Sequence, residues 1–171
     1  MRATRFEMAS DFQVSAADLW SFHMHDDALD VLAPPFSGFA VRDRGEGVSN
    51  GSVVEFALGA WPLRKRWVAL HCNVEPERSF TDIALDAPFP YWVHRHDMKS
   101  LAPESSRLVD TVWFRAPGGF PRWIADPAVR VVLRLMFSWR HWATRRWLAK
   151  NVSKSPRHEL NGSAMATGGS S

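Results

Sequence analysis

The sequence has very little cysteine and no long apolar run. Cys72 is the single cysteine among 171 residues, so it cannot form an internal disulfide, and the paired cysteines of a CxxC zinc site are absent. No segment approaches the roughly 20 consecutive apolar residues that span a bilayer. The first residues lack the apolar stretch and cleavage site of a secretory signal. These absences predict a cytoplasmic protein without a transmembrane segment.

Several catalytic signatures are also missing. The sequence has no Gly-rich phosphate loop, no G-x-S-x-G nucleophile elbow and no H-E-x-x-H pair. Phosphoryl transfer, elbow-type hydrolysis and zincin chemistry therefore lose the motifs that usually support them.

The composition is that of a globular protein. Hydrophobic residues make up 46% of the chain, nine residues are tryptophan, and the formal charge is +3. We expect one domain over residues 1–151 and a flexible Ser- and Gly-rich tail over 152–171. Basic residues gather between 130 and 150, which is typical of the solvated face of an amphipathic helix. No nucleic-acid module is recognisable, so we expect no nucleic-acid partner.

Alternating apolar and polar residues predict strands over most of the chain. Residues 4–14 alternate and predict a first strand. Ser15, with Asp18 three residues on, predicts the N-cap of a helix over about 16–25, and a second short helix over 26–32 ends before Pro34. Six more strands are expected at 39–43, 52–58, 64–74, 80–85, 91–101 and 107–115. Their short connections predict an antiparallel meander.

The last predicted element is a long helix. Asp126 followed by Pro127 indicates an N-cap and a proline at the first helical position, and the helix should run to about Lys150, roughly 35 Å. Its apolar residues form a stripe that should pack on the sheet: Val129, Val132, Leu133, Met136, Phe137, Ala143 and Leu148.

Two of the expected strands carry polar residues on one face. In a strand, Trp92, His94, His96 and Met98 share a face because successive side chains point to opposite sides. After a turn at residues 103–106, Asp110 lies on a matching face of the next strand. A hairpin pairing of the two strands could bring Asp110 beside the histidines. Such a cluster on an inner face needs a partner or a purpose.

These residues belong to a longer pattern. The residues that carry it are Pro88, Phe89, Trp92, His94, His96 and Met98, then Leu108, Asp110, Val112, Pro117 and Gly118, then Phe137, Arg140 and His141. In this order the chain resembles a bacterial group of the SRPBCC superfamily, the START-like proteins that include polyketide cyclases and dehydratases. The group's pattern is PF..W.H.H.F, then L.D.V....P.G, then F..RH. Met98 stands where an aromatic residue is usual.

The resemblance implies an α+β helix-grip fold, a curved antiparallel sheet wrapped around a long C-terminal helix. Between them it implies an elongated apolar cavity for a hydrophobic small molecule of polyketide, lipid or aromatic type. The order of the predicted elements agrees with this fold. We expect six residues to line the cavity: Trp67, Trp92, Met98, Val112, Phe114 and Phe137.

Three interpretations of His94, His96 and Asp110 stay open. A histidine could act as a general acid or base with Asp110 holding its tautomer, as cyclisation or dehydration without a cofactor would require. The histidines could instead anchor a ligand in a non-catalytic binding or carrier module. They could also only satisfy each other. A zinc site is a weaker fourth interpretation, so we expect neither a metal nor a cofactor.

Some features remain unassigned. A third class of function is an interaction protein whose basic terminal helix docks on an acidic partner or a membrane surface. A homodimer is one open oligomeric state. His23 and His25 lie near the end of the first predicted helix, where a protonated imidazole would favour the helix dipole. Either Glu55 or Asp82 could face the cavity, but spacing identifies no partner for them.

Overall fold

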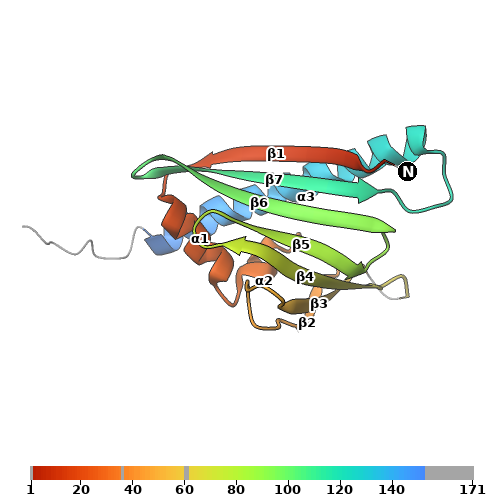
Figure 1. Ribbon diagram of the computed structural model, residues 1–171, viewed down its shortest axis with the longest axis horizontal. Helices are drawn as coiled ribbons and strands as arrows, with labels where there is room; N and C mark the ends of the chain where they lie inside the picture. Colours follow the sequence, from red (N-terminus) through yellow and green to blue (C-terminus); the bar gives the residue numbers. More distant parts are fainter. Residues whose placement is uncertain (1, 36, 60–61, 153–171) are drawn as a thin grey trace, which may run out of the picture.

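The computed structural model describes residues 2–35, 37–59 and 62–152 (Figure 1). The predicted tail over 152–171 therefore lies outside the described residues, apart from Val152. The described residues form seven strands and three helices: β1 (Thr4–Phe12), α1 (Ala16–Met24), α2 (Ala28–Leu32), β2 (Ala40–Asp43), β3 (Val53–Leu58), β4 (Lys65–Glu75), β5 (Ser79–Asp86), β6 (Tyr91–Ala102), β7 (Ser105–Arg115) and α3 (Arg122–Asn151).

The strands form one antiparallel sheet in the order β1-β7-β6-β5-β4-β3-β2. Strands β2 to β7 form a meander, as predicted. The first strand, β1, pairs with the last strand, β7. In Figure 1, α3 runs along one face of the sheet, and α1 and α2 cover the same face towards one end. The predicted helix-grip architecture is confirmed.

The start of α1 follows the predicted capping signal. The Ser15 hydroxyl accepts a hydrogen bond from the backbone N–H of Asp18 at 3.0 Å and donates one to its carboxylate at 2.7 Å. These bonds satisfy a donor in the first turn that the helix itself leaves free.

The predicted start of the terminal helix is wrong. α3 begins at Arg122, about one turn before Asp126. Pro127 lies inside the helix, where its missing N–H removes the hydrogen bond to the carbonyl of Trp123. The Asp126 carboxylate accepts from the Thr4 hydroxyl at 2.6 Å and from Arg122 at 3.1 Å. Asp126 thus ties the helix to β1 instead of capping it.

The buried face of the sheet holds two hydrophobic clusters. We call one the aromatic core; its main side chains are Phe6, Trp67, Trp92, Phe114 and Phe137. We call the other the α1 core; its main side chains are Phe12, Leu19, Phe22, Phe80 and Leu148. The aromatic core packs mainly against the first half of α3, and the α1 core packs where α1 meets the sheet.

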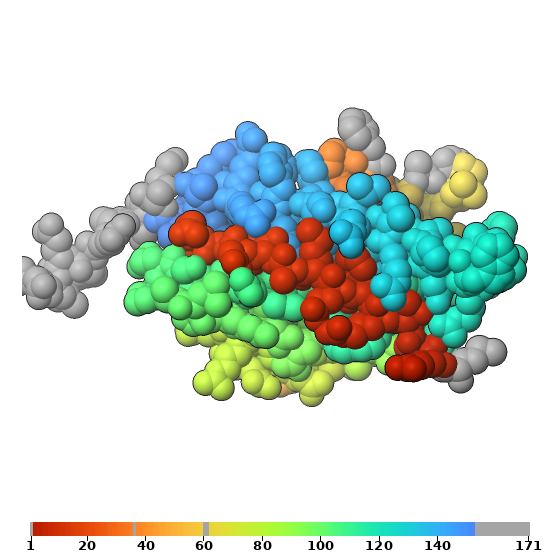
Figure 2. Space-filling model, turned by 90° about the horizontal axis from the view of Figure 1, so that it is seen from above, coloured from red at the N-terminus to blue at the C-terminus, as the bar shows by residue number. Residues whose placement is uncertain are grey.

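The outward face of α3 is unusually apolar. Figure 2 shows the helix, cyan to blue, on the surface beside β1. Its exposed apolar residues are Trp123, Ile124, Val131, Val132, Leu135 and Trp142. The prediction that Val132 is buried is wrong, because Leu133, Phe137 and His141 at spacings of four define the inner face. The interaction hypothesis depends on the basic residues of this helix, and it stays a prediction. Among the described residues, no helix is both long and apolar enough to cross a membrane.

Candidate functional site

Strands β6 and β7 bring the three predicted polar residues together. Asp110 lies directly across from His96 in the strand register, and Val112 lies across from His94. His94 Nε2 donates a hydrogen bond to Asp110 Oδ1 at 2.8 Å. His96 Nδ1 forms an ion pair with the same oxygen at 2.8 Å. All three side chains are buried. The pairing expected from strand alternation is therefore present.

Helix α3 adds a third histidine to Asp110. His141 Nε2 donates to Asp110 Oδ2 at 2.6 Å, and His141 Nδ1 lies 2.8 Å from the hydroxyl of Ser10 on β1. Sequence reasoning gave His141 no role, although it belongs to the F..RH part of the resemblance pattern. That position was the available signal.

A second carboxylate lies on the other side of His96. Asp82 on β5 accepts a hydrogen bond from His96 Nε2 through its Oδ2 at 3.2 Å. Its Oδ1 forms an ion pair with His71 Nε2 at 3.0 Å. His71 Nδ1 is 2.9 Å from the carbonyl of Gly47, so this nitrogen must carry a proton. Although burial acts in the opposite direction, the Asp82 carboxylate raises the pKa of His71 and so favours its protonated form.

We call these six residues the histidine–aspartate network: His71, Asp82, His94, His96, Asp110 and His141. Of the two acids that spacing left undecided, Asp82 belongs to the network. Glu55 pairs with Arg66 at 2.7 Å in a partly exposed contact. A buried charge is tolerated only when partners compensate it, and both carboxylates here have several.

The network separates the protonation states of its members. Burial alone would lower the pKa of His96, but the Asp110 and Asp82 carboxylates outweigh burial and raise the pKa to about 9. Burial lowers the pKa of His94 to about 4, and the charge on His96 adds to the effect. Although burial would raise the pKa of each carboxyl, the histidine contacts hold the pKa of Asp82 and of Asp110 well below the usual range. At neutral pH, His96 is a cation between two carboxylates and His94 is neutral.

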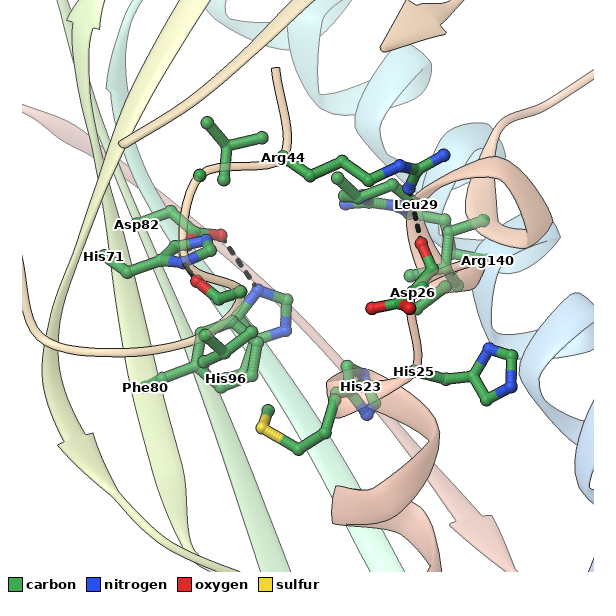
Figure 3. Close-up of a pocket in the computed structure, with 17 residues that line it drawn as sticks. His23, His25, Asp26, Leu29, Arg44, His71, Phe80, Asp82, His96 and Arg140 are labelled. Carbon is green, nitrogen blue, oxygen red and sulfur yellow. Dashed lines mark hydrogen bonds and ion pairs between the residues drawn. The ribbon is translucent and has the colours of Figure 1, made fainter. Parts of the chain in front are cut away.

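A pocket opens at one edge of the network, between the sheet and the loops around α1 and α2 (Figure 3). Its volume is about 130 Å³. The apolar part of its wall includes Ala28, Leu29, Leu32, Val48, Val54 and Phe80. The polar part includes His23, Arg44, His71, Asp82, His96 and Arg140. His94 and Asp110 stand behind this wall, so the network meets the pocket through His96, Asp82 and His71.

His23 is a pocket residue that the sequence did not identify. Its side chain is buried, with Nδ1 2.8 Å from the carbonyl of Leu19. Burial and the charge on His96 lower the pKa of His23 to about 4. The predicted cationic role at the helix end is therefore wrong. Because Nδ1 must donate to the carbonyl, the neutral ring has a free lone pair on Nε2.

The six residues expected to line a cavity lie in the two hydrophobic clusters and not around the pocket. Trp67, Trp92, Val112, Phe114 and Phe137 lie in the aromatic core, and Met98 lies in the α1 core. Trp67 and Trp92 pack edge to face with ring centroids 5.1 Å apart. None of the six is among the residues around the 130 Å³ pocket. Their role in ligand binding stays a prediction.

One trio in the network has the composition of a metal site. Asp82, His94 and His96 have ligand atoms within 4.8 Å of one another, and all lie in the interior or partly so. His94 Nδ1 is 3.7 Å from Asp82 Oδ2, and His96 Nε2 is 3.2 Å from the same oxygen. A metal ion there would have to displace the proton that His96 donates to Asp82.

No protein family model and no curated protein matches the sequence. Among solved structures, the chain is similar to the Zhui aromatase/cyclase from Streptomyces sp. R1128, with a TM-score of 0.69 and 18% identity over 88% of this chain and 96% of that one. It is also similar to norcoclaurine synthase from Thalictrum flavum, with a TM-score of 0.65 and 13% identity over 90% of each chain.

A START superfamily protein from Mycobacterium smegmatis is a third similar structure, with a TM-score of 0.66 and 11% identity over 85% of this chain and 97% of that one. These likenesses show that the chain has the SRPBCC/START-like helix-grip fold, as the sequence pattern predicted. At such identities they establish the fold and not the reaction.

Proposed function

We propose that this protein binds a small, partly apolar molecule in the pocket beside the histidine–aspartate network. The observation that carries the proposal is the mixed wall of the pocket. Leu29, Leu32 and Phe80 offer apolar contact, and His23 and Arg140 offer polar atoms within the same wall. Apolar walls with a few convergent polar groups are the usual composition of a small-molecule site.

The volume favours a ligand whose buried part is about one aromatic ring. A cavity of 130 Å³ is close to the roughly 150 Å³ of an engineered cavity that binds benzene. Of the expected polyketide, lipid and aromatic classes, single-ring aromatics therefore fit best. Norcoclaurine synthase, which has the same fold, has been solved in complex with dopamine and hydroxybenzaldehyde, both single-ring compounds. A longer molecule would extend through the mouth of the pocket.

Native mass spectrometry of protein purified from cell lysates tests this proposal. Leu29 lines the pocket from α2, so Leu29→Trp should fill the space and remove a co-purified small molecule. Leu135→Trp is the matched control, because Leu135 is exposed on α3. A clean apo mass for the wild type in several lysates would count against binding. So would a bound mass that survives in Leu29→Trp.

Acid–base catalysis without a cofactor is a second candidate function. The observation favouring it is that His23 and His96 line the same pocket, with ring centroids 5.8 Å apart and pKa values of about 4 and about 9. Neighbouring groups whose pKa values are pushed apart are a frequent sign of divided acid and base roles.

In this candidate function, His23 Nε2 accepts a proton from the carbon beside a ligand carbonyl. The electron pair of that C–H bond moves to the carbonyl oxygen, and the His96 cation stabilises the resulting enolate. Asp110 positions His96 by holding its Nδ1. We choose His96 over His94 because His94 stands behind the pocket wall. Enolisation of this kind is the first step of aldol cyclisation or dehydration.

Exchange of ligand protons for deuterium provides the test. Phenylacetone in D₂O, followed by NMR, should lose its α-protons faster with the wild type than with buffer alone. His23→Gln should abolish the acceleration and keep binding, whereas Arg134→Gln, an exposed change on α3 outside the pocket, should keep both. If exchange with the wild type equals that in buffer while phenylacetone binds, the protein is a binding module without this chemistry.

A further inference from the structure

Arg140 is a cation of the pocket wall for which the described residues provide no ion-paired carboxylate. It lies on α3 next to His141, lines the pocket and is half-buried. Its guanidinium lies over the ring of Phe137, 5.7 Å from the ring centroid. Within the described part of the chain, Arg140 forms no ion pair with a carboxylate.

The other cations around the pocket are paired. Arg44 binds the Asp30 carboxylate and the backbone carbonyl of Asp26. His71 binds Asp82 at 3.0 Å, and His96 lies between Asp82 and Asp110. Figure 3 shows Arg44 and Arg140 on the same side of the pocket, across from the pair of His71 and Asp82.

A count of charges leaves one positive charge uncompensated. His71, His96 and Arg140 are three cations, and Asp82 and Asp110 are the two carboxylates among them. Asp26 also lines the pocket, but its side chain is exposed, where water screens its charge. Burial lowers the pKa of the Arg140 guanidinium even though Asp110 and Asp82 act in the opposite direction. The cation is thus less well stabilised than it would be in water.

The same pocket contains a hydrogen-bond acceptor. His23 lines the pocket with Arg140, and the charge on Arg140 contributes to lowering the pKa of His23. His23 holds its Nδ1 on the Leu19 carbonyl and has a lone pair on Nε2. The polar part of the pocket wall therefore includes a guanidinium donor and a neutral acceptor.

We propose that the ligand carries a carboxylate that binds the Arg140 guanidinium, with its ring against the apolar wall around Leu29, Leu32 and Phe80. A hydroxyl beside the carboxylate would donate to His23 Nε2. A planar guanidinium binds a carboxylate through two parallel N–H···O bonds, which a neutral amide cannot reproduce. This inference rests on the proposed binding function and names the class of ligand: a monoanionic, single-ring aromatic acid.

Benzoate and benzamide form a matched pair of probes, because they share a ring and a planar headgroup and differ in charge. Isothermal titration or protein-observed NMR should show benzoate binding at least about tenfold more tightly than benzamide to the wild type. Arg140→Met should remove that preference, and Arg140→Lys should keep part of it. Arg134→Met, an exposed change on the same helix, should leave the preference intact. Thermal melts of each variant control for folding.

The outcomes separate this inference from the binding proposal. If benzamide binds as well as benzoate, or if Arg140→Met keeps the preference for benzoate, the carboxylate inference is wrong and the binding pocket stands. If neither probe binds the wild type at millimolar concentration, the inference fails. The binding proposal itself would be wrong only if native mass spectrometry also showed no bound small molecule in the wild type.

Discussion

The aromatic core and the histidine–aspartate network lie on the same strands of the sheet's buried face. Apolar packing stabilises the first, and pairing of buried charges stabilises the second. In one half, Trp92 on β6 lies across from Phe114 on β7. Four residues further along β6, His96 lies across from Asp110. Helix α3 covers the two halves with Phe137 and, one turn later, His141. One backbone register therefore carries a dry aromatic core and a buried network of charges.

This difference separates two sources of stability. The aromatic core gains free energy in proportion to the apolar area that it removes from water, and this gain does not depend on pH. The histidine–aspartate network must first overcome the desolvation of Asp82, Asp110 and the histidine cations. It is stable only because each charge is paired. We infer that the network is present for what it does at the pocket wall, since aromatic packing would fill the same space without that cost.

The largest expected effect comes from breaking the network at its centre. Asp110→Asn should lower the free energy of unfolding at pH 7 by about 3–5 kcal/mol, because it leaves the His96 cation with one buried carboxylate and disturbs the bonds to His94 and His141. Urea denaturation followed by circular dichroism measures the loss.

Asp97→Asn is the matched control. Asp97 lies on the opposite face of β6 and pairs with Arg95 at 2.9 Å in a partly exposed contact. Such a pair contributes at most about 1 kcal/mol. Equal losses for the two variants would contradict the view that the buried charges depend on their pairing.

A smaller effect is expected from pH. The free energy of unfolding should fall both when the pH rises above neutral and when it drops below it. His96 has a pKa of about 9 in the folded protein and 6.5 in an unfolded chain. Its contribution of about 3 kcal/mol is complete below pH 6.5 and disappears as the pH rises through 9. His23 and His94, with pKa values of about 4, act in the other direction. The unfolded chain takes up their protons first, so stability falls as the pH drops from 6.5 to 4.

Stability should therefore be greatest near pH 6.5, as measured by urea midpoints between pH 4 and 9.5. In His96→Gln most of the decline above pH 6.5 should disappear, and His71, whose pKa is also raised, should account for the remainder. Phe114→Leu in the aromatic core should lower the whole curve by about 1–2 kcal/mol without changing its shape, because Phe114 is buried away from the histidines. A wild-type curve that rises steadily to pH 9 would show that His96 is not held as a cation.

Much of this comparison could be predicted from the sequence, because it depends on local rules. Strand alternation placed His94 and His96 on one face, and the turn before β7 set the register that puts Asp110 across from His96. The Ser15 cap and the limits of the strands followed from neighbouring residues. Local rules failed at Asp126, because its partner, Thr4, lies 122 residues away.

The contacts that sequence reasoning did not identify come from elements whose placement is not local. Asp82 meets His96 only because β5 pairs with β6 in one particular register. His141 reaches Asp110 because α3 presents one side to the sheet, and Arg140 faces the pocket for the same reason. His23 becomes neutral only when α1 packs over Phe80 and His96. Spacing along the chain contains no information about these contacts.

The smallest expected effect concerns metal ions. Asp82, His94 and His96 offer three ligand atoms, so Zn²⁺ is the ion that would test whether the charged half is a metal centre. We expect 1 mM EDTA and an equimolar amount of Zn²⁺ each to leave the melting temperature unchanged. In the structure the Asp82 Oδ2 atom already accepts the proton of His96 Nε2 at 3.2 Å. A Zn²⁺ ion would have to remove that proton and break the bond.

Zn²⁺ binding at a concentration of 100 times Kd would stabilise the fold by about 2.7 kcal/mol, which a thermal melt detects easily. A rise in melting temperature of that size with Zn²⁺, absent in Asp82→Asn, would show that the histidine–aspartate network is a metal site. The metal ion, and not the proton on His96, would then hold the network together.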